Sequence, residues 1–364
     1  MVKNRSDIFI ICGEKSGDTH GSFLVKELLK INPSLKIHCW GGDMMEKAGA
    51  KLLQNYNSYN VMGFLEVFLK LNYLSKKLNE CKKHILELNP RVILLIDFPG
   101  FNLRIAKFSK NNNFNVHYYI PPKAWAWNKK RVKVLSKFTD MIYSILPFEL
   151  EFFRSNGCEI KYVGNPVFNQ VTNLKTNKKS SQKIISLLPG SRKSEIKYSL
   201  PIFIKLCKEL SSFKFLVCAV NNIPKRDYSS IQNIKNVKLI FDDTYNSVSS
   251  SDLAIVMSGT ASLEVAYLNI PHAVVYKTSR LSYLIAKLLV RVKYFSLTNL
   301  ILNKKVVNEF IQDDFNIDKL ILEIERLSDL EVISEIQDDY LKIKKVIGVK
   351  NSSKEVAESL IKSL

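Results

Sequence analysis

The chain alternates short apolar runs, rich in β-branched residues, with longer segments of helical periodicity, and this alternation restricts the fold more than any other feature. The run Val92-Ile93-Leu94-Leu95-Ile96 is apolar without interruption. Such a strand is typical of a parallel sheet that is covered by helices on both faces. The sequence therefore predicts an α/β fold with doubly wound parallel sheets.

The alternation runs through the chain in two series. In the first series, strands are predicted at 7–12, 36–40, 91–97, 116–120, 140–146 and 160–164, and helices at 20–30, 63–88 and 102–111. A polar stretch at 173–182 interrupts the pattern and is the predicted linker. In the second series, strands are predicted at 183–188, 213–220, 237–241, 253–257 and 272–276, and a helix at 195–211. This predicts two Rossmann-like domains, 1–172 and 183–345, that face a cleft. A helical tail at 346–364 either crosses to the first domain or is exchanged between subunits.

The net charge of the chain and its cysteine content indicate which partners and sites to expect. Lys and Arg number 54 and Asp and Glu 34, which gives a formal net charge of +20. This excess favours polyanionic partners, namely nucleic acid, anionic lipid headgroups or phosphorylated substrates. The six cysteines form no CxxC pair, which predicts reduced, buried thiols and no zinc site. No signal peptide is predicted, and the apolar stretch 281–297 is broken by basic residues, so no membrane span is expected.

Ligands of open α/β sheets bind beyond the carboxyl ends of the strands, so the loops at these ends are the candidate site. The first predicted strand leads into Gly13-Glu14-Lys15-Ser16-Gly17-Asp18. This loop either cradles an anion on backbone N–H groups or is an ordinary strand-to-helix turn. Asp97 ends the buried strand, where a carboxylate is either a partly desolvated base or the cap of the next helix.

Two loops of the second series carry groups suited to phosphate. Gly190-Ser191-Arg192 combines close backbone approach with a guanidinium, although an exposed Arg on a surface turn fits equally well. Ser258-Gly259-Thr260 precedes a predicted helix whose free N–H groups suit a diphosphate. Glu264 follows one helical turn later, placed either to bind a ribose diol or merely to interact with the helix dipole.

Two segments have a composition that suits contact with a membrane or another large ligand. Residues 64–74 are apolar almost all round, so this helix is either fully buried or offers Phe64, Leu65, Phe68 and Leu69 to acyl chains or membrane. The segment 125–133 combines Trp125 and Trp127 with basic residues. This mixture is found in interfacial membrane anchors and in single-strand nucleic-acid binders, and a solvated helix face is the third interpretation.

Taken together and in order, these motifs resemble the lipid-A-disaccharide synthase family, and the resemblance covers residues 7–320. The matching segments are GEKSGDTHG at 13–21, VMGFLEV at 61–67, LLIDFPGFN at 94–102, PPKAWAWNKKRVKVLSKFTD at 121–140, PFELEFF at 147–153, VGNP at 163–166, LLPGSRKSEI at 187–196, MSGTASLEVAYLNIPHAVVYK at 257–277 and YFSLTNLILNKKVVNEFIQDDF at 294–315. The chain departs from the family pattern at Lys15, Gly100, Asn165 and the pair Pro121-Pro122. Gly100 puts in doubt a second carboxylate beside Asp97, and Asn165 puts in doubt an imidazole at that position.

The resemblance implies an inverting glycosyltransferase of the GT-B architecture. It would transfer 2,3-diacylglucosamine from its UDP ester to the 6-hydroxyl of 2,3-diacylglucosamine 1-phosphate, giving a β-1,6 bond and UDP in lipopolysaccharide biosynthesis. Implied roles are Asp97 as general base, Gly190, Ser191, Arg192, Ser258, Gly259 and Thr260 at the diphosphate, Glu264 at the ribose, Asn299 in polar donor-site contacts, and Ser16, Gly17 and Asp18 on the acceptor side. No cofactor and no metal are expected, because the chain lacks an Asp-x-Asp pair.

The acylated substrates imply a cytoplasmic enzyme that docks peripherally on the inner leaflet of the inner membrane, with a homodimer left open. The nearest rival functions are another UDP-N-acetylglucosamine-type transferase of the same architecture and a UDP-sugar epimerase. A nucleic-acid-binding module is the rival from another class. It is disfavoured because the basic residues are spread along both halves of the chain.

Overall fold

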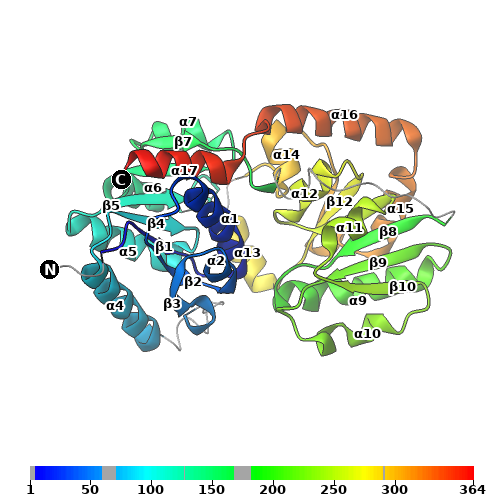
Figure 1. The fold of residues 1–364 in the computed structure, drawn as a ribbon. Helices are drawn as coiled ribbons and strands as arrows, with labels where there is room; N and C mark the ends of the chain where they lie inside the picture. Colours follow the sequence, from blue (N-terminus) through cyan, green and yellow to red (C-terminus); the bar gives the residue numbers. More distant parts are fainter. Residues whose placement is uncertain (1–4, 60–70, 127, 168–181, 290–291) are drawn as a thin grey trace. The chain divides into compact units, whose positions relative to one another are not determined.

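The computed structural model describes residues 5–59, 71–126, 128–167, 182–289 and 292–364 (Figure 1). The chain forms two compact units. The first comprises Met1–Pro166 together with Lys350–Leu364, and the second comprises Val167–Val349. The C-terminal segment therefore belongs to the first unit although the second unit separates the two in sequence.

The first unit is built on a parallel sheet of seven strands in the order β3-β2-β1-β4-β5-β6-β7. Its strands are β1 (Ile8–Ile11), β2 (Ile37–Gly41), β3 (Lys51–Asn55), β4 (Val92–Ile96), β5 (Asn115–Tyr119), β6 (Met141–Ser144) and β7 (Ile160–Tyr162). Its helices are α1 (Lys15–Ile31), α2 (Asp43–Lys47), η1 (Tyr56–Ser58), α4 (Leu71–Leu88), α5 (Pro99–Asn111), α6 (Lys130–Phe138), α7 (Glu149–Arg154) and α17 (Ser352–Lys362).

Successive side chains of a strand point to opposite faces of the sheet, and β4 fills both faces with apolar groups. Ile93 and Leu95 pack in a core cluster with residues of α4, α5, α6 and α7. Val92, Leu94 and Ile96 pack in a second cluster with residues of α1, α2 and α17. Burial on both faces explains why this strand is apolar at every position.

The C-terminal helix α17 completes the second of these layers. Its residues Val356, Ala357 and Leu360 are fully buried in the cluster that contains Leu24 and Leu28 of α1. Two tyrosine hydroxyls from the sheet also bond to it, because Tyr119 donates to Ser352 Oγ (3.1 Å) and Tyr143 donates to Ser359 Oγ (2.9 Å). Helix α17 is thus part of the core of the first unit.

The second unit repeats the design with a parallel sheet of six strands in the order β10-β9-β8-β11-β12-β13. Its strands are β8 (Ile184–Leu188), β9 (Lys214–Ala219), β10 (Val237–Phe241), β11 (Leu253–Met257), β12 (His272–Tyr276) and β13 (Glu309–Ile311). Its helices are α9 (Lys193–Glu209), η2 (Lys225–Tyr228), α10 (Ser229–Gln232), α11 (Thr244–Ser249), α12 (Ala261–Tyr267), α13 (Arg280–Leu289), α14 (Leu297–Leu302), η3 (Gln312–Asp314), α15 (Ile317–Arg326) and α16 (Leu330–Ile347).

The predicted α/β class with two doubly wound sheets is confirmed. Two strands were missed, β3 and β13, and both lie at a sheet edge. All three residues of β13, and four of the five in β3, are only partly buried, so neither strand shows the continuous apolar run of a central strand. The predicted linker 173–182 lies outside the described residues except for Gln182.

Candidate active site

The candidate loops follow the strands at which each sheet reverses its order of connection. In the first unit the chain runs outward from β1 through β2 to β3, then returns to β4 on the other side of β1. In the second unit the same reversal separates β8 from β11. Loops that follow such neighbouring strands diverge and leave a crevice, which is where ligands of these sheets bind. The predicted loops at 13–18, 97–98, 190–192 and 258–260 follow these four strands.

The turn after β4 is conformationally strained. Asp97 and Phe98 have φ angles of 45° and 51°, in the left-handed region that residues other than glycine rarely adopt. The Asp97 carbonyl accepts hydrogen bonds from the Tyr118 hydroxyl (2.6 Å) and from the Asn102 side-chain amide (2.8 Å). The N-cap of α5 is Phe98 rather than Asp97. The strained backbone holds Asp97 at the end of the strand with its side chain partly exposed.

Arg131, from α6, belongs to the electrostatic surroundings of Asp97. Burial lowers the pKa of the Arg131 guanidinium, and the neighbouring Tyr118 and Asp97 act in the opposite direction. Arg131 and Asp97 therefore interact electrostatically. In the sequence, Arg131 is only one of several basic residues that follow the tryptophans. Its relation to Asp97 depends on the packing of α6 against α5, which no local pattern reveals.

The loop after β1 is largely committed to holding the first unit together. The buried Asp18 carboxylate accepts hydrogen bonds from three backbone N–H groups at the start of α2, those of Gly42 (2.9 Å), Met44 (3.1 Å) and Met45 (3.1 Å). Gly17 is also buried, whereas Ser16 is exposed and donates to Glu14 Oε1 (2.8 Å). Of the three predicted acceptor-side residues, only Ser16 therefore presents its side chain at the surface.

The loop after β8 combines a fixed backbone with an exposed cation. Gly190 has a φ of 114°, and a Cβ there would lie 2.5 Å from Glu195 Oε2, so the fold requires glycine at this position. The Glu195 carboxylate accepts from the backbone N–H groups of Ser191 (2.9 Å) and Arg192 (3.2 Å). The Arg192 side chain remains 62% exposed, with its Nη1 3.7 Å from Glu195 Oε1. The loop thus has a backbone fixed by Glu195 and carries an exposed guanidinium.

The loop after β11 contains a glycine that the fold does not require. A Cβ at Gly259 would meet no atom of the described residues closer than 4.0 Å, and its backbone does not need the left-handed region. Thr260 is exposed, and Ser258 donates from Oγ to the Phe295 carbonyl (3.1 Å). The open space beside Gly259 leaves room for a ligand to approach the backbone. Helix α12 has only seven residues, so its dipole is a small part of this environment.

Glu264 is partly buried on α12, and the Tyr245 hydroxyl of α11 donates a hydrogen bond to its carboxylate. Burial raises the pKa of Glu264 to about 7, and the bond from Tyr245 lowers it. The carboxylate therefore changes charge near neutral pH. No local sequence pattern indicates this role of Tyr245, because its partner is 19 positions away in the sequence.

Asn299 is fully buried within the second unit. Its Oδ1 accepts from the backbone N–H groups of Val306 (2.8 Å) and Val307 (3.0 Å). Its Nδ2 donates to the Val307 carbonyl (2.9 Å) and to Glu309 Oε1 (2.9 Å). The side chain organises the turn between α14 and β13, and its amide is saturated by these contacts.

Trp125 is anchored by a buried carboxylate. Its Nε1 donates to Glu149 Oε1 (3.0 Å), and its ring packs edge-on against Phe148 at a centroid distance of 4.9 Å. Burial raises the pKa of Glu149 to about 7, against the opposing effect of the Trp125 hydrogen bond. The indole remains partly exposed, so part of its surface is free to contact other molecules. Phe64, Leu65, Phe68, Leu69 and Trp127 lie outside the described residues.

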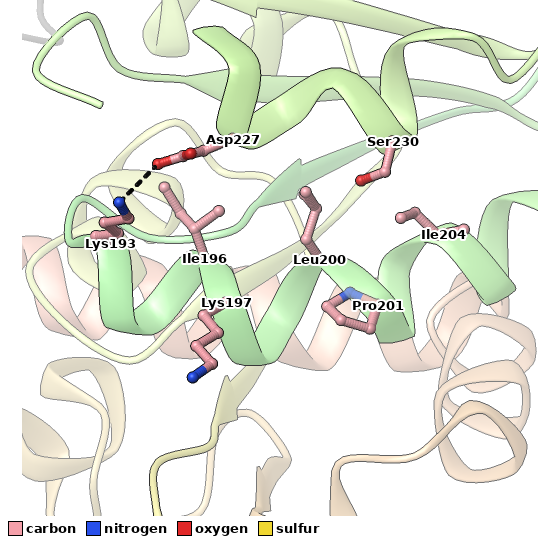
Figure 2. Close-up of a pocket in the computed structure, with 8 residues that line it drawn as sticks. All are labelled: Lys193, Ile196, Lys197, Leu200, Pro201, Ile204, Asp227 and Ser230. Atoms are coloured by element: carbon pink, nitrogen blue, oxygen red, sulfur yellow. Dashed lines mark ion pairs between the residues drawn. The ribbon is translucent and has the colours of Figure 1, made fainter. Parts of the chain in front are cut away.

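A separate cavity of about 300 Å³ lies beside α9 of the second unit (Figure 2). Ile196, Leu200 and Ile204 line it with Pro201, and Lys193 pairs with Asp227 at its edge (3.7 Å). The lining is mainly apolar and includes none of the predicted site residues. Within the described parts of the chain, no cluster of three His, Cys, Asp or Glu side chains could hold a metal ion.

Comparison with known proteins gives one consistent family. The family model described as lipid-A-disaccharide synthetase matches residues 8–362. The lipid-A-disaccharide synthase 1 of Legionella pneumophila (strain Paris) is 36% identical over 331 residues, which are 86% of each chain. The lipid-A-disaccharide synthase of Geobacter sulfurreducens is 29% identical, covering 100% of this chain and 99% of the relative.

Solved structures share the fold at low sequence identity. The UDP-GlcNAc 2-epimerase from Neisseria meningitidis, bound to UDP-GlcNAc, superposes with a TM-score of 0.67 at 15% identity, over 98% of this chain and 99% of that one. The MurG protein of Acinetobacter baumannii gives a TM-score of 0.56 at 11% identity, over 98% and 99% of the two chains. The family match covers nearly the whole chain, so this protein belongs to the lipid-A-disaccharide synthase family.

Proposed function

We propose that this protein transfers 2,3-diacylglucosamine from its UDP ester to the 6-hydroxyl of 2,3-diacylglucosamine 1-phosphate. The bond from O6 to the anomeric carbon forms as the bond from that carbon to the diphosphate oxygen breaks. The electron pair leaves with UDP, and the hydroxyl proton passes to a base. A single displacement turns the α-linked donor into a β-1,6 product.

Asp97 is the proposed base. Its strained turn, its partial exposure and its place after a switch-point strand support this role. The neighbouring Arg131 places a cation in the electrostatic surroundings of the proposed base.

The loops of the second unit are the proposed donor site. Arg192 neutralises the charge that grows on the diphosphate, together with the backbone N–H groups of Gly259 and Thr260. The N–H of Ser191 donates to Glu195, so Ser191 supports the loop rather than the diphosphate directly. Glu264 accepts hydrogen bonds from the ribose. Gly190, Ser258 and Asn299 support the site indirectly by fixing its loops. The observation that carries the proposal is the open space at Gly259, because neither packing nor backbone conformation accounts for a glycine there.

The first unit is the proposed acceptor side, with Ser16 near the acceptor phosphate and Gly17 and Asp18 shaping the loop from within. We propose that Trp125, Trp127 and the apolar segment 64–74 dock this unit peripherally on the inner leaflet, where both acylated substrates reside. No described helix is both long and apolar enough to cross a bilayer.

The direct test is to incubate the purified protein with both acylated substrates in detergent micelles and to measure UDP release. The expected result is UDP release that depends on the acceptor, together with a product whose new bond is β-1,6 by NMR. Release of UDP without any acceptor, or isomerisation of the donor sugar, would refute the transferase assignment in favour of the epimerase alternative.

A further inference from the structure

Helix α13 of the second unit carries an exposed leucine stripe. Leu281, Leu284 and Leu288 are 70%, 57% and 81% exposed, and their spacing of three and four residues places them on one face of the helix. Among the described elements, none packs extensively against α13. Ser279 caps its start, since its Oγ accepts from the backbone N–H of Ser282 (3.2 Å). A stable helix thus projects three large apolar side chains into solvent.

The stretch of sequence that contains this stripe carries charge of one sign. Between Lys277 and Asn308 the sequence contains no Asp or Glu, and its basic residues are Lys277, Arg280, Lys287, Arg291, Lys293, Lys304 and Lys305. Within α13, Arg280 and Lys287 are exposed and lie beside the leucines on the helix surface. An apolar face with flanking cations is the signature of a helix that lies in the interface of an anionic bilayer.

Two other exposed leucines of the same unit show that apolar exposure alone is a weaker signal. Leu322 on α15 and Leu330 on α16 are 64% and 81% exposed. The segment 313–331 around them contains seven Asp and Glu residues: Asp313, Asp314, Asp318, Glu323, Glu325, Asp329 and Glu331. An anionic membrane surface would repel this segment and attract α13.

The segment after α13 connects it to the proposed donor loop. The Phe295 carbonyl accepts from Ser258 Oγ (3.1 Å), and the Phe295 ring stacks on Tyr276 of β12 at a centroid distance of 6.3 Å. Lys293 lies 5.2 Å from the centroid of the Tyr294 ring, a further pairing of aromatic and cation. Along the chain, α13 therefore ends six residues before the residue that contacts the loop at Ser258.

From these observations we infer that α13 is a membrane-docking helix of the second unit, which inserts its leucine face into the anionic bilayer surface. The proposed function supplies the reason for such docking, because the donor carries acyl chains and must be taken from a membrane. The docking of α13 is separate from that of the apolar segment in the first unit, so each unit has its own contact with the bilayer.

The test measures flotation of the full chain with phosphatidylcholine vesicles, with and without about one third phosphatidylglycerol. We expect the double variant Leu284→Ser/Leu288→Ser to bind the anionic vesicles about tenfold more weakly than the unaltered protein. The matched control Leu322→Ser/Leu330→Ser removes two equally exposed leucines and should bind normally. Lys287→Glu should weaken binding by about fivefold at low salt and less at high salt.

A reporter variant tests insertion directly. In Leu284→Trp, fluorescence from the new indole should shift to the blue with anionic vesicles and be quenched by brominated lipid. Unchanged flotation of the double variant, equal losses in the control, or no reporter response would overturn the inference. A change in molecular mass in place of vesicle binding would also overturn it, since that result assigns the stripe to a second copy of the chain.

Transferase activity separates this inference from the proposed function. In detergent micelles the double variant should release UDP at the normal rate, because the substrates are then dispersed. If the unaltered protein floats through α13 but never releases UDP, the proposed function fails and the membrane helix stands. If the unaltered protein releases UDP but the double variant floats normally, the proposed function stands and the inference about α13 fails.

Discussion

The loops at the switch points of the two sheets differ in how far their polar groups are hydrogen-bonded within the protein or exposed to solvent. In the first unit nearly every group is engaged, since Asp18 is bonded to α2, Asn102 bonds to the strand ends, and Asp97 lies on a strained turn. In the second unit Arg192 and Thr260 are exposed, and space is open beside Gly259. A rigid frame around one carboxylate suits proton transfer, whereas exposed donors suit a bulky, charged leaving group. On the proposed roles, the same fold serves two tasks because its loops differ in how far their polar groups are hydrogen-bonded or exposed.

The largest expected effect tests the rigid side of this comparison. Asp97→Asn keeps the side-chain shape but removes the base, so turnover should fall by about 10²- to 10⁴-fold. UDP binding, measured by calorimetry, should stay unchanged because the proposed nucleotide site lies in the other unit. Near-normal turnover in this variant would show that Asp97 is not the base.

A second carboxylate from the same side should behave differently. Asp18→Ala leaves the N–H groups of Gly42, Met44 and Met45 without their acceptor, at a cost of about 3 kcal/mol. The thermal midpoint should fall by roughly 5 °C or more. Unchanged melting combined with a raised acceptor KM would mean instead that Asp18 contacts the acceptor.

Arg192→Ala tests the exposed side. Loss of its charge-assisted bonds to the diphosphate should lower kcat/KM for the donor by about 10- to 100-fold, with the melting temperature preserved. Arg192→Lys keeps the charge but not the planar guanidinium that can donate two parallel hydrogen bonds, so it should recover only part of the lost kcat/KM. Steady-state kinetics at varied donor concentration would measure both, and unaltered donor kinetics would remove Arg192 from the site.

The smallest effect sharpens the assignment of Glu264. Donor binding needs the carboxylate, whose pKa is about 7, so kcat/KM for the donor should fall as the pH drops through neutrality. Tyr245→Phe removes a hydrogen bond that lowers this pKa, so the acid limb should move to higher pH. At neutral pH the loss should be about two- to tenfold. A uniform loss at every pH would point to a structural role for Tyr245.

The sequence by itself determined the architecture and the position of the loops. Continuous apolar runs such as 92–96 are typical of strands buried on both faces, and they predicted the parallel sheets. Because parallel strands share one carboxyl edge, the sequence also predicted that the candidate loops lie at that edge, whereas the strand order that makes β1 and β4, and β8 and β11, neighbours comes from the structure. The motifs then identified the family, since their order along the chain is more specific than any single motif.

Only the tertiary structure decided what each side chain does within those loops. Asp18 follows a predicted strand like the other candidate residues, yet its carboxylate accepts hydrogen bonds from backbone N–H groups 24 to 27 positions away. The side-chain amide of Asn299 is fully hydrogen-bonded by the turn that follows α14. Helix α17 packs with α1 although the whole second unit lies between them in the sequence. Hydrogen bonding and burial depend on which segments meet in space, and local patterns carry no information about such distant partners.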